Sequence, residues 1–103
     1  MSIYHIVDPE TWEALEDSEP YAAGSLETEG FIHCSFKHQL AGVLERYYKG
    51  SGRLVILEID PERLDVELVT EPSTGGEEYP HIYGKINKEA VCGTMNVLAP
   101  EDD

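Results

Sequence analysis

Three of the four histidines lie inside short runs of aliphatic and aromatic residues that are typical of buried β-strands. The runs cover residues 3–7, 29–35 and 79–84. Because side chains alternate across a strand, the two polar residues of each later run point to one face. A buried imidazole costs stability unless its ring nitrogens find partners. We therefore expect a shared polar cleft, lined by His5, His33, Ser35, His81 and Tyr83.

The remaining runs predict the rest of the secondary structure. Residues 53–59 are the most aliphatic stretch and predict a central strand, expected in one sheet with residues 3–7 and 31–34. Other strands are predicted for residues 66–70, 79–83 and 91–98, and a brief one for residues 25–26. Helices are predicted for residues 9–16, with Asp8 as N-cap, and 36–48, with Ser35 as N-cap. Single helical turns are predicted for residues 61–64 and 87–90, and a mobile surface loop for residues 70–79.

These elements predict a single α+β domain over residues 1–98. Its sheet is expected to be split and mostly antiparallel, and it has two main helices. Residues 99–103 form an acidic tail that we expect to be frayed.

Charge limits the classes of partner. The chain has 21 acidic and 7 basic residues and a formal net charge of −14. Nucleic-acid binding relies on clustered lysine and arginine, so we expect no nucleic-acid partner and no anionic membrane. There is no apolar run of membrane-spanning length and no secretory leader pattern, so we expect a cytoplasmic protein. The oligomeric state stays open.

A small positive spot is predicted within this acidic protein. Lys37 falls in the first turn of the helix expected after Ser35, where backbone N–H groups favour an anion. This arrangement suits a phosphate or pyrophosphate, with Ser35, Lys37 and His81 as ligand-binding residues. The alternative is that Lys37 simply pairs with a nearby acid.

Metal and nucleophile chemistry are less favoured by the spacing. The histidines and both cysteines, Cys34 and Cys92, could ligate zinc, but no CxxC or HxxxH pair is present, so no metal is expected. A hydrolase nucleophile at Cys34 or Ser35 would need a base in reach. We expect two free thiols rather than a disulfide.

The IHCS and PHIYG motifs, with Tyr4, Tyr21 and the LEID stretch at 57–60, make the chain resemble the family called domain of unknown function 952. That resemblance covers residues 3–98. It implies a fold similar to that of ADP-ribosyltransferases.

A second resemblance is to the NAD-dependent RNA 2′-phosphotransferases, through Tyr4, His5 and the IHCS motif. It implies NAD as cofactor, with His5 contacting the nicotinamide-side ribose and His33 at the second position of a catalytic triad. Residues 81–83 fall near the third position, so His5, His33 and Tyr83 are the catalytic candidates. The usual triad glutamate is absent from that strand, although Glu77 and Glu78 precede it.

Two functions follow as expectations. One is an enzyme, or a former enzyme, that binds NAD or a related small nucleotide and transfers ADP-ribose. The other is a non-catalytic module that binds a small phosphate-bearing ligand or a protein in the same cleft. The absence of the usual triad glutamate is the sequence feature that distinguishes the enzyme from the binding module.

Overall fold

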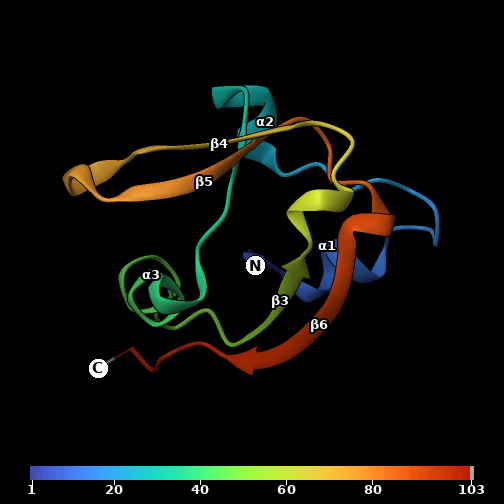
Figure 1. The fold of residues 1–103 in the computed structure, drawn as a ribbon. Coiled ribbons are helices and arrows are strands. Elements are labelled where there is room, and N and C mark those ends of the chain that lie inside the picture. The colour runs from blue at the N-terminus through green and yellow to red at the C-terminus, as the bar shows by residue number, and fades with distance from the viewer. Residues whose placement is uncertain (103) are drawn as a thin grey trace.

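Two antiparallel three-stranded sheets form the framework of the computed structural model, which describes residues 1–102 apart from the side chain of Thr74 (Figure 1). The first sheet has the order β1-β3-β6, and the second has the order β2-β5-β4. Every strand pair is antiparallel. The strands are β1 (Ile3–Val7), β2 (Ile32–His33), β3 (Arg53–Ile59), β4 (Glu67–Pro72), β5 (Glu78–Tyr83) and β6 (Val91–Leu98). The prediction of an α+β fold with mostly antiparallel sheet is confirmed.

The two sheets meet at a single bridge between β1 and the segment after β2. The N–H of Tyr4 donates to the carbonyl of Ser35 at 2.8 Å, and the N–H of Ser35 donates back to Tyr4, also at 2.8 Å. β2 itself pairs with β5, not with β1. The expectation that residues 31–34 share one sheet with β1 and β3 is therefore wrong. The contact with β1 comes only at Ser35, two residues beyond the end of β2, so a single bridge and not a ladder joins the two sheets.

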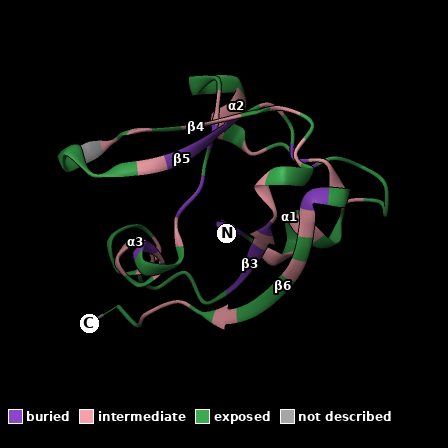
Figure 2. Cartoon of the chain, in the orientation of Figure 1, coloured by how far each residue is buried: buried purple, intermediate pink, exposed green. Residues whose placement is uncertain are grey.

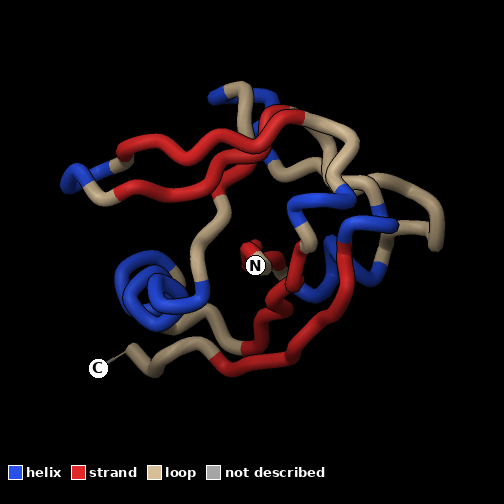
Figure 3. The backbone as a smooth tube through the Cα atoms, viewed as in Figure 1, coloured by secondary structure: helices blue, strands red, loops and turns tan. Residues whose placement is uncertain are grey.

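Three α-helices occur in the described residues. Figure 3 draws them in blue together with the 3₁₀ turns. α1 (Pro9–Glu13) begins as predicted, since the carboxylate of Asp8 accepts the N–H of Thr11 at 2.9 Å, but it stops before residue 16. α2 (Gly24–Glu29) replaces the strand predicted at residues 25–26 and ends at Gly30, which takes a φ of 87°. α3 (Leu40–Tyr47) follows a 3₁₀ turn, η1 (Lys37–Gln39), so the predicted long helix is two pieces.

Ser35 does not cap this helix. The N-cap position of η1 belongs to Phe36, and the backbone of Ser35 is already used in the bridge to Tyr4. The other short turns are η2 (Pro61–Arg63), η3 (Thr74–Gly76) and η4 (Lys88–Ala90). The turns predicted at residues 61–64 and 87–90 are thus present in shortened form.

The segment predicted as a mobile loop is the tip of a β-hairpin. β4 continues to Pro72 and β5 starts at Glu78. The tip is tied to η1, because the amide of buried Gln39 donates to the carbonyl of Glu78 at 2.8 Å. The start of the tail is also held: the N–H of Gly50 donates to the carbonyl of Pro100 at 2.8 Å. Residues 99 and 100 are thus hydrogen-bonded to residues 52 and 50, and Asp103 lies outside the described residues.

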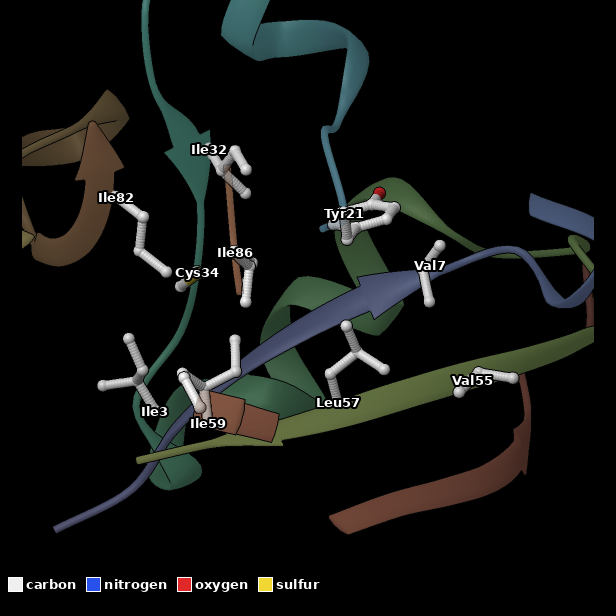
Figure 4. Packing of buried hydrophobic residues seen from close by; sticks show 11 residues of the cluster. Ile3, Val7, Tyr21, Ile32, Cys34, Val55, Leu57, Ile59, Ile82 and Ile86 are labelled. Carbon is white, nitrogen blue, oxygen red and sulfur yellow. The ribbon is translucent and has the colours of Figure 1, made fainter. Parts of the chain in front are cut away.

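The hydrophobic core has two parts. The larger lies between the two sheets and gathers side chains such as Ile3, Leu57 and Ile82 (Figure 4). The smaller one, with Tyr4, Ile6, Leu54 and Ile56, is covered by α3. β1 and most of β3 are therefore buried on both faces, whereas β6 and the hairpin tip are largely exposed (Figure 2). This double burial explains why residues 53–59 read as a continuous aliphatic run.

Candidate functional site

A cleft of about 1020 Å³ opens where the two sheets meet. Its walls come from β1, the loop before α2, the segment after β2, α3 and the hairpin tip. The polar and aromatic groups in the lining include His5, Tyr21, Ser35, Tyr48, Arg53 and Tyr79. Such a hollow is large enough for a nucleotide-sized ligand.

His5 is the best-defined polar group of the cleft. Its Nδ1 lies 2.6 Å from the carbonyl oxygen of His33, so Nδ1 must carry the hydrogen and donate it. The other nitrogen, Nε2, lies 3.0 Å from the hydroxyl of Tyr21 and accepts its hydrogen. Burial lowers the pKa of His5 to about 4. His5 is therefore a neutral ring that holds Tyr21 in place, and not an acid or base near pH 7.

Tyr21 is one of the residues that carry the family resemblance, but it was not predicted to belong to the site. It is buried, and its backbone exchanges hydrogen bonds with Ile86 at 2.9 and 2.8 Å. Burial raises the pKa of its hydroxyl to about 12, so the hydroxyl keeps its hydrogen. Because that hydrogen goes to His5, the oxygen lone pairs remain as acceptors for a ligand hydroxyl. The sequence signal that could have indicated this role is the single aromatic residue, Tyr21, in the polar segment between Pro20 and Gly24.

The carbonyl group and the ring of His33 make contacts in two different places. Its carbonyl holds His5 in the cleft, while its ring is about half exposed and its Nε2 lies 3.0 Å from a carboxylate oxygen of Glu29. Across the sheet it is paired with His81, and the two rings lie 5.3 Å apart in an edge-on arrangement. His33 thus borders the cleft and also belongs to a second group of side chains.

That second group lies on the outer face of the β2-β5-β4 sheet, because the alternate residues Ile32, Leu68 and Ile82 pack into the main core. We call it the outer-face cluster: Glu29, Phe31, His33, Glu71, His81 and Tyr83. In its centre, Nδ1 of His81 lies 2.8 Å from Oε1 of Glu71, and the hydroxyl of Tyr83 donates to the same oxygen. The ring of Phe31 stacks on His81 at 4.2 Å.

Hydrogen bonds set the ionisation of this cluster. The bonds from Tyr83 and His81 lower the pKa of the Glu71 carboxyl, so it is ionised near neutral pH. The same contact raises the pKa of Tyr83. Sequence reasoning missed Glu71 and Phe31, since only the register of β4 on β5 and of β2 on β5 brings them to His81.

The structure does not gather the predicted site residues into one cleft. His5, His33 and Ser35 line the cleft, whereas His81 and Tyr83 belong to the outer-face cluster. Lys37 lines a different hollow of about 740 Å³. Ser35 is not the N-cap of η1, and it lines the cleft, so the two residues of the expected anion site lie in different hollows.

Within residues 1–102, no group of three or more histidine, cysteine or acidic side chains is placed to hold a metal ion. Both thiols are free. Burial raises the pKa of Cys34, so this thiol stays protonated and is a poor nucleophile. No helix in the described part of the chain is long and apolar enough to cross a membrane.

These features define a small α+β protein with two antiparallel sheets and a cleft at their junction. Residues 6–94 match the family described as "Protein of unknown function (DUF952)", and the chain belongs to this family. The crystal structure of protein CC0527 from Caulobacter crescentus is similar, with 28% identity and a TM-score of 0.80 over 93% of this chain and 85% of that one. Its solution NMR structure gives 29% identity and a TM-score of 0.75 over 91% and 82%. No curated protein matches the sequence.

Proposed function

We propose that the cleft binds NAD or a related nucleotide through its ADP-ribose part, and that the two sheets are arranged as in ADP-ribosyltransferases. The observation that carries this proposal is the hollow of about 1020 Å³ with the neutral pair of His5 and Tyr21 in its wall. Small-molecule sites commonly have volumes of about 300–1,000 Å³ and combine apolar walls with a few placed polar groups. A dinucleotide is a ligand of suitable size.

The lining supplies a partner for each part of such a ligand. Tyr47, Tyr48 and Tyr79 offer aromatic faces on which a flat base can stack. Arg53 supplies a positive charge for a pyrophosphate. The Tyr21 hydroxyl can accept a hydrogen bond from a ribose hydroxyl.

The topology supports the comparison with NAD-dependent transferases. The resemblance to the RNA 2′-phosphotransferases names His5 and His33. They lie on β1 and β2, and Nδ1 of His5 donates to the carbonyl of His33 where the two sheets meet. In ADP-ribosyl transfer the bond between nicotinamide and ribose breaks through an oxocarbenium-like state that positioned groups stabilise. We expect this step to be slow here, because the usual triad glutamate is absent from residues 80–84 and neither Glu77 nor Glu78 lines the cleft.

A specific observation favours a second candidate, a non-catalytic binding module in the same cleft. Both ring nitrogens of His5 are engaged by protein groups, and its pKa is about 4. The ring therefore has no free position for proton transfer. In this alternative, the ligand binds without turnover.

Calorimetric titration with NAD and with ADP-ribose tests the binding. Tyr47 is 63% exposed, so Tyr47→Leu should leave the fold intact and weaken binding by about fivefold or more through loss of stacking. Tyr83→Leu makes the same change outside the cleft and should leave affinity unchanged. Absence of binding to the wild-type protein, or equal affinity in both variants, would reject the proposal. Chromatographic detection of free nicotinamide then distinguishes the enzyme from the binding module.

A further inference from the structure

We propose that the outer-face cluster binds a guanidinium group, presented as an arginine side chain by a peptide or a partner protein. This site is distinct from the cleft, and it does not rest on the nucleotide function proposed above. Three features of the cluster point to such a ligand: an unpartnered ring nitrogen, stacked aromatic faces and two carboxylates that pair with histidine but with no lysine or arginine of residues 1–102.

The unpartnered nitrogen belongs to His81, whose exposure is only 3%. Its Nδ1 donates to the ionised carboxylate of Glu71, and in the neutral ring Nε2 then carries the lone pair. Nε2 is buried and has no hydrogen-bond partner within residues 1–102. β5 lies between β4 and β2, so His81 has Glu71 on the β4 side and the ring of His33, 5.3 Å away, on the β2 side. A buried polar nitrogen of this kind needs a partner, which residues 1–102 do not supply.

The aromatic rings provide faces for a flat cation. Phe31 stacks on His81, and its centroid lies 5.4 Å from that of Tyr83, which is 38% exposed. Ring faces carry negative potential and attract cations. A guanidinium is planar and weakly hydrated, so it stacks on such rings more readily than an ammonium does.

Two carboxylates flank the rings on opposite sides. Glu29 comes from the end of α2 and Glu71 from β4, and their side chains are 50% and 32% exposed. Each contacts a histidine, and neither pairs with a lysine or arginine in the part of the chain that the structure describes. A positive group placed between them is attracted by both.

The number of acceptors favours a guanidinium. Glu29, Glu71 and Nε2 of the neutral His81 ring offer three acceptor groups, and guanidinium has five N–H donors in one plane. The cluster lies on an open sheet face, and small free ligands prefer hollows. A side chain held by a larger partner is therefore the better fit. Nε2 of His81 is buried in the free protein, so a side chain must move before the ligand can reach it. We expect the exposed ring of His33 to make this movement, as interface side chains commonly do.

The test is an NMR titration, without nucleotide, with the peptide acetyl-Gly-Arg-Gly-amide. The comparison peptides carry citrulline, which has the same shape without charge, or lysine, which has charge without the planar fork. We expect the ring signals of His33, His81 and Tyr83 to shift, and the arginine peptide to bind at least about fivefold more tightly than the others. Equal binding of either comparison peptide, or shifts elsewhere in the protein, would overturn the proposal.

Charge-removing variants localise the site. Glu71→Gln should weaken binding of the arginine peptide by about fivefold, and Glu29→Gln, on an exposed side chain that carries little risk to folding, should do so as well. Glu101→Gln removes the same charge from the tail and should bind as the wild type does. The backbone amide spectrum of each variant reports whether it is folded. If the folded Glu29→Gln variant binds like the Glu101→Gln control, the cluster is not the site.

Discussion

At the scale of single residues, the three strand histidines have three different environments. His5 is neutral and fixed on both sides, His33 has an exposed ring beside Glu29, and His81 is paired with Glu71 at one nitrogen only. The apolar runs predicted their strands correctly. Their partners could not be predicted, since Tyr21 lies 16 residues from His5 and meets it only through the fold.

The pH dependence of stability should report the burial of His5. Its pKa is about 4 in the folded protein and about 6.5 in an unfolded chain. Between these values the unfolded state binds more protons, so the free energy of unfolding falls as pH falls from about 6.5 to about 4. Above about pH 6.5 the group makes no pH-dependent contribution. Urea unfolding at pH 7 and 4.5 should show that the wild type loses about 2–3 kcal/mol more than His5→Gln.

The matched control is His38→Gln, which removes an exposed imidazole. Between pH 7 and 4.5, His38→Gln should lose as much stability as the wild type. Acidic groups such as Glu71 are present in the wild type and in both variants, so their contribution cancels in the comparison. The same loss in His5→Gln and in the wild type would show that the buried ring does not titrate as described.

At the scale of elements, local sequence signals predicted the positions of the strands better than the pairing of the strands or the lengths of the helices. β3 and β6 have the predicted bounds, since Gly52 and Asp60-Pro61 delimit the first and an apolar alternation marks the second. The error at residues 25–26 arose because two residues carry no periodicity, and Gly24 and Gly30 in fact delimit α2. The pairing of β2 with β5 rather than β1 depends on long-range register, which no local pattern specifies.

The turn after β5 should tolerate no side chain at Gly84. A Cβ added there would lie 2.5 Å from Cγ1 of Val66, well inside van der Waals contact. We expect Gly84→Ala to lower the free energy of unfolding by about 1–3 kcal/mol through overpacking, measured by urea unfolding. Adding Val66→Ala should recover part of the loss. Gly24→Ala, which meets no atom within 4 Å at the start of α2, should be neutral or stabilising by up to about 1 kcal/mol. Equal effects at the two glycines would contradict the packing seen at Val66.

At the scale of the whole molecule, acidic charge opposes compaction. The net charge of −14 is confined to a body of 40 × 33 × 27 Å. The Debye length is about 30 Å at 0.01 M salt, so most charges then repel one another across the molecule. Few ion pairs relieve this repulsion, because only seven residues are lysine or arginine.

Salt should therefore stabilise this protein. Raising NaCl from about 0.01 M to about 0.5 M shortens the Debye length to a few ångströms and screens the repulsion, so the melting temperature should rise. A rise of about 4–8 °C corresponds to about 1 kcal/mol for a domain of this size. A triple variant, Glu27→Gln with Glu62→Gln and Glu101→Gln, removes three exposed charges. It should melt higher than the wild type at low salt and respond less to added NaCl. A wild-type protein whose melting temperature falls or stays constant with NaCl would show that its acidic groups are compensated locally.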